Sequence, residues 1–288
     1  MTARLIVALP GIGVVPSDSP ILLATDLGAL RGDGVFEAAH VRDGRPWLLA
    51  EHLDRMARSA GRLGLDLPPS SELTALAESA CAAWPAEREG ALRLNCTRGS
   101  DHTGAGPGGP TVWATISPIG ADQRRDRRTG LAVVTADLGV SATAPTHPWL
   151  LRGAKTLSYA VNMAARRWAV EQGYDEMLWL SSDGYALEAP TASLVWLDGQ
   201  TLCTVPSADT GILPGITAAW LLRHADELGL RAAERMIRPA ELLGTQGVWL
   251  ASSVRGLAEV RSLDRVDLPA SVHTEALLKL LGFEADPE

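Results

Sequence analysis

The sequence predicts a mixed α/β (α+β) fold of two domains, and three observations support this prediction. Hydrophobic residues make up 46% of the chain and charged residues 21%, so a packed core is expected and wholesale disorder is not. The 288 residues suit two domains or one large domain, at about 150 residues per domain. Short strand-like and helix-like runs alternate irregularly, unlike the regular pattern of a doubly wound sheet.

The first part of the chain predicts a strand pair followed by a helix. Residues 35–41 and 47–49 favour strands that are joined by a turn at 42–44. Apolar residues then recur at helical spacing and predict a helix that ends at Gly64. The apolar face of this helix is expected to contain Leu53, Met56, Ala57, Ala60 and Leu63.

A second helix and two more strands complete this part. Ser70 or Ser71 is expected to cap a helix that runs to Ala83. Residues 91–97 and 111–117 favour strands, and the glycine-rich segment 99–110 is expected to be the loop between them.

The polar and charged segment 120–130 predicts the domain boundary. We expect it to be a solvated interdomain linker, although its basic run could also bind an anion. The predicted division is therefore a small N-terminal α/β domain at 1–119, the linker at 120–130, and a larger C-terminal domain at 131–288.

The second part of the chain again mixes strands and helices. Gly173 and Gly229 are expected to end two of its helices. The dipeptide Asp198-Gly199 predicts a β-hairpin. The predicted strands are 131–135, 176–180, 193–197, 201–205 and 247–252, and the predicted helices are 156–171, 217–228 and 272–281.

Charge and composition exclude several classes of function. The formal net charge of −8 gives no general attraction to nucleic acid. No apolar stretch reaches the roughly 20 residues that span a bilayer, and no clear signal peptide is present. The three cysteines match no metal or disulfide spacing, so we expect no metal site and a cytoplasmic protein.

Two lysines, Lys155 and Lys279, are the only lysines in the chain. Lys155 lies among apolar residues, where it either extends its ammonium toward water or is desolvated. Desolvation lowers the pKa of an ammonium, and the resulting amine can form a Schiff base and transfer protons. Lys279 lies on the C-terminal predicted helix beside Glu275 and is expected to be a solvated surface residue.

Two other positions could bind a cofactor. Glu188 follows a turn and could pair with a cationic ring nitrogen, or it could be an exposed charge at the end of a strand. The segment 213–217 places Gly215 and Thr217 at a helix start, where free backbone N–H groups can bind an anion. A plain capped helix start is the alternative.

In this order, these segments resemble the class IV aminotransferases, the fold-type IV enzymes that depend on pyridoxal 5'-phosphate (PLP). The resemblance extends from about residue 25 to residue 265. The matching stretches are Arg31-Gly32-Asp33-Gly34-Val35-Phe36-Glu37, His52-Leu53-Asp54-Arg55, Lys155-Thr156-Leu157-Ser158-Tyr159, Gly184-Tyr185-Ala186-Leu187-Glu188, Leu213-Pro214-Gly215-Ile216-Thr217 and Ser252-Ser253.

The resemblance implies two α/β domains with PLP in the cleft between them, and a homodimer in which the partner completes the active site. The loop at 99–110 would reach toward the partner's site. Lys155 would bind PLP covalently and move protons, and Glu188 would pair with the pyridine nitrogen. The remaining cofactor contacts would come from Arg55, Ile216, Thr217 and Ser253 at the phosphate and from Tyr159 near the ring hydroxyl.

The family includes lyases and transaminases that act on small-molecule amines. The sequences around Lys155 and before Ser253 look most like those of actinobacterial 4-amino-4-deoxychorismate lyases. Those enzymes make 4-aminobenzoate and pyruvate for folate biosynthesis. Phe36 and the segment 100–104 differ from the pattern of D-amino-acid aminotransferases. We therefore expect a lyase first. The alternatives are a transaminase of D-amino acids, branched-chain L-amino acids or (R)-amines, and a non-catalytic PLP-fold binding protein.

The substrate carboxylate could be bound by Arg98 or Arg152, and Phe36 is a further candidate for the substrate site. A structural role for Arg98 near a strand end is an equal alternative.

Overall fold

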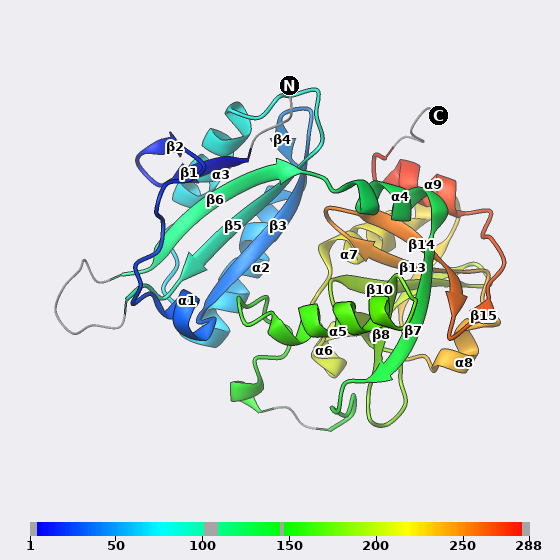
Figure 1. Ribbon diagram of the computed structural model, residues 1–288. Coiled ribbons are helices and arrows are strands. Elements are labelled where there is room, and N and C mark those ends of the chain that lie inside the picture. Colours follow the sequence, from blue (N-terminus) through cyan, green and yellow to red (C-terminus); the bar gives the residue numbers. More distant parts are fainter. Residues whose placement is uncertain (1–4, 101–108, 145–146, 284–288) are drawn as a thin grey trace. The chain divides into compact units, whose positions relative to one another are not determined.

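The computed structural model describes residues 5–100, 109–144 and 147–283. The chain forms two compact units, each with its own hydrophobic core. Unit 1 contains Met1–Gly120 and the short segment Ala154–Tyr159, and unit 2 contains Ala121–Gly153 and Ala160–Glu288. Both units combine helices with a large sheet, which confirms the predicted mixed α/β fold (Figure 1).

Unit 1 is built on an antiparallel sheet with the strand order β2-β1-β6-β5-β3-β4. The long central strands carry alternating or continuous apolar residues, as expected for a sheet that is covered on its core face. The strands are β1 (Ile6–Leu9), β2 (Gly13–Val15), β3 (Gly34–Arg42), β4 (Arg45–Pro46), β5 (Gly90–Thr97) and β6 (Thr111–Pro118).

Three helices accompany this sheet: α1 (Leu27–Arg31), α2 (Leu49–Leu63) and α3 (Ser70–Ala82). Helices α2 and α3 pack on the sheet and share its hydrophobic core (Figure 1). Gly64 ends α2 in a left-handed conformation, as predicted. The predicted serine cap of α3 is wrong, because Pro69 occupies the N-cap and no side chain caps the helix. The predicted strand at 47–49 is also wrong, because α2 already begins at Leu49.

Unit 2 contains a mixed sheet whose main path is β12-β11-β10-β13-β14-β7-β8. Strands β9 and β15 pair at its margins with β10 and β14. The predicted hairpin at Asp198-Gly199 is confirmed as the turn between β10 and β11. The strands are β7 (Leu131–Asp137), β8 (Glu176–Leu180), β9 (Glu188–Ala189), β10 (Ala192–Asp198), β11 (Thr201–Thr204), β12 (Arg231–Glu234), β13 (Gly247–Ser252), β14 (Gly256–Leu263) and β15 (Val266–Asp267).

The helices of unit 2 are mostly short. The predicted helix at 217–228 divides at His224 into α7 and a 3₁₀ turn, Ala225–Leu228. A second 3₁₀ turn spans Pro148–Leu150. The α-helices are α4 (Ala121–Thr129), α5 (Ala160–Glu171), α6 (Ser207–Thr210), α7 (Ile216–Arg223), α8 (Pro239–Leu242) and α9 (Thr274–Leu280).

Helix α4 occupies the segment for which the sequence predicted a solvated linker. The linker prediction fails because one charged side chain of the segment turns inward: Asp126 is 8% exposed. It pairs with Arg255, a residue that is distant in the sequence. Helix α4 thus packs on β14 as part of unit 2.

Three further observations concern the cysteines, membrane-spanning helices and metal-binding groups. Cys81, Cys96 and Cys203 are free and buried. Among the described residues, no helix is long and apolar enough to cross a membrane. The same part of the chain contains no group of three or more His, Cys, Asp or Glu side chains that could bind a metal.

Candidate active site

The segment that carries Lys155 runs along one edge of β3. Thr156 forms a β-bridge with Val35, and the backbone of Phe36 donates to the Lys155 carbonyl at 3.1 Å. The Leu157 N–H donates in turn to the Gly34 carbonyl at 2.8 Å. A Cβ on Gly34 would lie 2.5 Å from the Cys96 carbonyl oxygen and 2.7 Å from Leu157, so the close approach requires glycine. The predicted helix at 156–171 therefore begins only at Ala160.

Helix α2 fixes the same segment from a second direction. The Lys155 N–H donates to Ser59 Oγ at 3.0 Å, and that hydroxyl donates to the Arg55 carbonyl at 3.0 Å. Ser59 is buried, so water does not compete for these bonds. The backbone of the lysine is thus tied to both the sheet and the helix of unit 1.

Two aromatic rings flank the Lys155 amine. Nζ lies 4.5 Å from the ring centroid of Phe36 and 5.7 Å from that of Tyr159. The two rings meet edge to face, with centroids 5.2 Å apart. Phe36 is buried and lies beside Lys155, and its expected role in the substrate site stays a prediction.

A residue that the sequence interpretation did not single out, Arg93, lies on the same ring. Its Cζ is 3.8 Å from the Phe36 centroid, and its Nε donates to Asn95 Oδ1 at 2.8 Å. Burial lowers the pKa of Arg93, which nevertheless stays charged because a guanidinium titrates above neutral pH. The alternation of β5 places Arg93 and Asn95 on one face and could have indicated this pair, but an arginine in a strand usually points to water.

Arg55, predicted to bind the cofactor phosphate, forms a buried ion pair with Glu37. Arg55 Nε and Nη2 each donate to one Glu37 oxygen at 2.7 Å, and His52 Nδ1 lies 2.7 Å from Oε2. Burial alone would raise the pKa of Glu37, but Arg55 and His52 lower it to about 2. Burial lowers the pKa of His52, so the neutral ring donates its Nδ1–H to the carboxylate.

Arg98 is engaged at the end of β5. Its guanidinium donates to both Asp33 oxygens, at 2.7 and 3.1 Å, and to the carbonyls of Leu63 and Gly64, at 2.8 and 2.9 Å. The Asp33 contacts raise the pKa of Arg98. These contacts connect the end of β5 to the end of α2. They are of the kind expected if Arg98 has a structural role instead of binding the substrate carboxylate.

The other predicted site residues lie in unit 2. Glu188 is half-buried on β9, and its Oε1 accepts a hydrogen bond from the Leu213 N–H at 3.2 Å. This bond connects the carboxylate to the loop that leads into α7. Glu188 and the segment 213–217, which the sequence analysis treated as separate candidates, are therefore neighbours.

The start of α7 resembles an anion site. Gly215 is its N-cap, and no side chain caps the helix, so the first-turn N–H groups of Ile216 and Thr217 have no side-chain cap partner. Thr217 Oγ1 lies 3.4 Å from Ser253 Oγ, which belongs to the turn between β13 and β14. A Cβ on Gly215 would lie 2.0 Å from Ser193 Oγ, so glycine is required here. Two hydroxyls and a helix start thus converge.

Arg152, the other candidate for the substrate carboxylate, lies in unit 2 and contacts backbone carbonyls. It donates to the carbonyl of Ser141 at 3.1 Å and to that of Thr210. Residues 101–108, which include most of the loop expected to reach a partner, lie outside the described residues.

These groups match the chemical needs of PLP. The aldehyde requires an amine, which Lys155 supplies between two rings. The pyridine nitrogen requires an acceptor such as Glu188, and the phosphate requires donors such as an uncapped helix start with two hydroxyls. Within each unit, the residues therefore suit one part of the cofactor that the resemblance implies.

Comparison with known proteins supports the same family. The profile of the amino-transferase class IV family matches residues 34–263. A protein of Mycobacterium tuberculosis described as a bifunctional aminodeoxychorismate lyase / D-amino acid transaminase is 38% identical over 286 residues. That alignment covers 96% of this chain and 97% of the relative.

Solved structures also match along nearly the whole chain. A hypothetical aminotransferase from Mycobacterium tuberculosis in its PLP-bound form has a TM-score of 0.91 and 38% identity, and the match covers 96% of this chain and 97% of that one. A fold IV transaminase from Curtobacterium pusillum has a TM-score of 0.89 and 36% identity, with 96% and 99% coverage.

Proposed function

The chain belongs to the class IV aminotransferase family, and on this premise we propose that it cleaves 4-amino-4-deoxychorismate to 4-aminobenzoate and pyruvate. Homologues in this family are PLP-dependent aminotransferases and aminodeoxychorismate lyases. The observation that carries the proposal is the Lys155 amine beside Phe36, with the guanidinium of Arg93 on the same ring. A base next to a fixed cation suits a substrate that carries both an amine and a carboxylate.

Lys155 is the proton-transfer residue in this proposal. When bound, PLP supplies the electron sink that stabilises a carbanion beside the substrate nitrogen. The Lys155 amine removes the proton from that carbon and returns a proton later in the reaction. The rings of Phe36 and Tyr159 lie beside the amine, and the bond to Ser59 fixes the backbone from which the amine extends.

The other site residues bind and orient the cofactor. We assign Glu188 to the pyridine nitrogen, and the first turn of α7, with Thr217 and Ser253, to the phosphate. Arg55 adds a positive charge for the phosphate, and its bidentate pair with Glu37 fixes the plane of the guanidinium.

Arg93 is the residue that we assign to the substrate carboxylate. Its half-buried guanidinium lies against the same ring as the Lys155 amine. Arg98 instead has contacts with Asp33 and the end of α2. A planar guanidinium recognises a carboxylate through two parallel hydrogen bonds, which also orients the substrate amine toward Lys155.

D-amino acid transamination is the second candidate activity. The mycobacterial relative carries both names, and a matching solved structure is described as binding α-ketoglutarate and pyridoxamine phosphate (PMP). Both reactions start with the same proton removal by Lys155, so one site can serve both.

We further propose that the chain acts as a homodimer in the cytoplasm. Several large apolar side chains are exposed in the single chain, among them Leu30 at 61% and Trp149 at 73%. The proposal rests on the resemblance to a family in which a second subunit completes the active site, and these exposed side chains are candidates for burial by that second copy. Light scattering on the purified protein tests this: a monomer at assay concentration would contradict the homodimer.

Two assays test the proposed function on the PLP-loaded enzyme. With 4-amino-4-deoxychorismate, 4-aminobenzoate and pyruvate should form in equal amounts, and their absence would exclude the lyase. With D-alanine, L-leucine or a chiral aryl amine, conversion of the bound cofactor to pyridoxamine phosphate would establish transamination. The variant Lys155→Ala is the control for both assays. No turnover with any of these amines would favour the remaining alternative, a non-catalytic binding protein.

A further inference from the structure

The turn between β13 and β14 carries two polar residues with different surroundings. Ser252 and Gly256 face each other across the hairpin, which leaves Ser253, Val254 and Arg255 in the turn. Ser253 is half-buried and lies near Thr217, whereas Arg255 is only 4% exposed. The turn therefore connects the proposed phosphate ligand to a buried cation two residues away.

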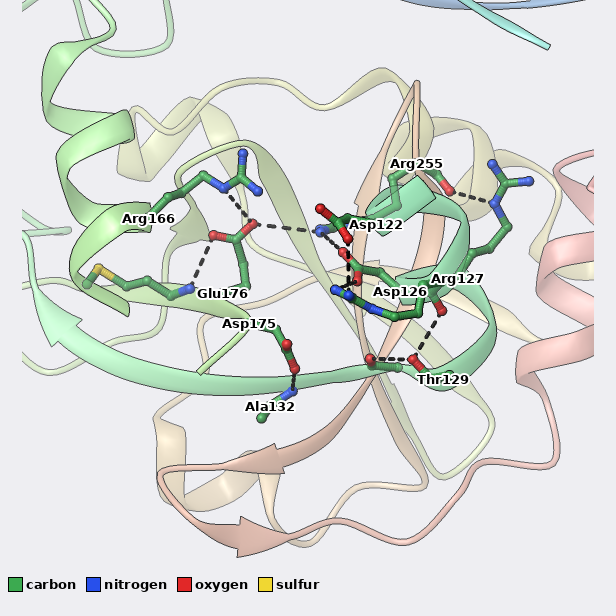
Figure 2. Close-up of polar contacts among 12 residues, drawn as sticks. Asp122, Asp126, Arg127, Thr129, Ala132, Arg166, Asp175, Glu176 and Arg255 are labelled. Carbon is green, nitrogen blue, oxygen red and sulfur yellow. Dashed lines mark hydrogen bonds and ion pairs between the residues drawn. The ribbon is translucent and has the colours of Figure 1, made fainter. Parts of the chain in front are cut away.

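Arg255 lies between two buried carboxylates (Figure 2). Its Nη1 is 3.7 Å from Asp126 Oδ2 on α4 and 3.7 Å from Glu176 Oε2 at the start of β8. Glu176 is fully buried, and Arg166 of α5 approaches the same oxygen to 3.5 Å. One side chain thus ties the turn to two other elements of unit 2.

The backbone of the turn is fixed as well. Arg127, the neighbour of Asp126 on α4, donates from Nε to the carbonyl oxygen of Arg255 at 3.0 Å (Figure 2). The guanidinium of Arg127 also stacks on Phe283 at 4.0 Å. Helix α4 therefore contacts both the side chain and the main chain of Arg255.

The buried cluster of Arg255, Asp126, Glu176 and Arg166 is poorly suited to stabilising the fold. Within the described residues, Arg255 Nε and Nη2 have no hydrogen-bond partner although they are buried. Burial raises the pKa of Glu176, since the loss of water outweighs the attraction of Arg255 and Arg166. A buried ion pair of this kind is often no more stable than an apolar replacement, so its use is better sought in geometry.

We infer that Arg255 is a positioning residue that sets the β13–β14 turn so that Ser253 faces the start of α7. This inference rests on the proposed function, in which Ser253 and α7 bind the cofactor phosphate. The side chain acts through the turn and does not touch the cofactor. Loss of the Arg255 contacts should therefore weaken recognition of the phosphate without affecting recognition of the pyridine ring.

The test compares PLP with pyridoxal, which lacks the phosphate, as ligands of the apoenzyme. The variant Arg255→Lys keeps the charge but lacks the planar guanidinium whose Nη1 lies 3.7 Å from both carboxylates. We expect its dissociation constant for PLP to rise by at least about tenfold, the size of one charge-assisted hydrogen bond. The constant for pyridoxal should stay within about twofold of the wild-type value. Both constants are measured from the absorbance of the bound aldehyde.

The variant Arg166→Lys is the matched control, because Arg166 contacts the same oxygen of Glu176 but lies on α5. It should keep the wild-type ratio of the two constants, even if its melting temperature falls. If Arg255→Lys does not fold, the double variant R255M/E176Q replaces it, since Asp126 retains its contact with Arg125.

An unchanged ratio in a folded Arg255 variant would overturn the inference and leave the proposed function intact. An equal change in Arg166→Lys would also overturn it, because the effect would then belong to the cluster as a whole. A wild-type enzyme that binds pyridoxal as tightly as PLP would instead refute the phosphate site of the proposed function, and the inference with it.

Discussion

Ser59 accepts a hydrogen bond from the backbone N–H of Lys155 at 3.0 Å, across 96 positions of the sequence. The same hydroxyl donates to the Arg55 carbonyl, so one small side chain connects the two residues that we assign to the aldehyde and to the phosphate of the cofactor. Neither bond involves a charge, and Ser59 is buried, so their effect should be seen in the free energy of unfolding as well as in the rate.

Replacing Ser59 with alanine should lower the free energy of unfolding by about 1–2 kcal/mol, because a buried N–H loses its acceptor. Urea unfolding at neutral pH measures this. Ser158→Ala is the control, since the exposed Ser158 donates to the Gly32 carbonyl at 3.2 Å and should change stability by less than about 0.5 kcal/mol. Equal effects of the two variants would contradict the buried role of Ser59.

Lys155→Ala should abolish the cofactor link that borohydride reduces. The chain has one other lysine, Lys279, which is exposed on α9. Lys279→Ala should therefore keep the reduced adduct at full yield. Mass spectrometry of the reduced and digested protein locates the adduct, and its persistence in Lys155→Ala would refute the assignment of the lysine.

The buried Glu37 should make the protein sensitive to acid. Its pKa falls from 4.5 to about 2 on folding, so ionised Glu37 contributes stability that is fully present above about pH 5. This contribution is lost as the pH falls toward 2, and it amounts to about 3 kcal/mol at neutral pH. Unfolding free energies of the wild type and Glu37→Gln should therefore converge as the pH falls from 5 to 3.

The control for this experiment is Asp54→Asn, at an exposed position of α2, the helix that carries Arg55. Its difference from the wild type should stay below about 0.5 kcal/mol over the same pH range. A constant difference between the wild type and Glu37→Gln at every pH would show that the carboxylate is not ionised in the folded protein.

Arg93→Met should weaken the binding of substrates that carry a carboxylate. We expect kcat/KM for such substrates to fall by about 100-fold, the size of a lost bidentate charge pair. A chiral aryl amine without a carboxylate should be affected by less than about threefold. Arg58→Met, at an exposed position on α2, is the control. A uniform loss with both kinds of amine would indicate a structural role for Arg93.

Local signals in the sequence predicted several elements well. Helix α2 ends at Gly64, and β13 spans Gly247–Ser252, because a glycine and an apolar run mark these limits without help from distant residues. The order of the family motifs also predicted the residues that the structure groups around Lys155 and around α7. The backbone of the Lys155 segment itself is fixed by contacts with β3 and Ser59, which are distant in the sequence.

The errors come from contacts that are distant in the sequence. Residues 155–157 bond to β3 instead of starting the predicted helix, and α4 is held in unit 2 by its one buried charge, Asp126, which pairs with Arg255. Strand β14 was not predicted, because Glu259 and Arg261 interrupt its apolar pattern. The structure explains Glu259, which accepts hydrogen bonds from Ser271 and Thr274. On α2, Ala57 is exposed whereas His52 and Arg55 are buried with Glu37.

The membership of Ala154–Tyr159 in unit 1 has a consequence for biosynthesis. A ribosome releases the chain from its N-terminus, so Met1–Gly120 emerges before the segment that pairs with β3 at Val35. Until residue 159 has left the exit tunnel, that stretch of the β3 edge lacks its neighbour and is open to pairing with other chains. Translation therefore adds the segment of Lys155, the residue that we propose to be catalytic, to unit 1 after the strands of its sheet.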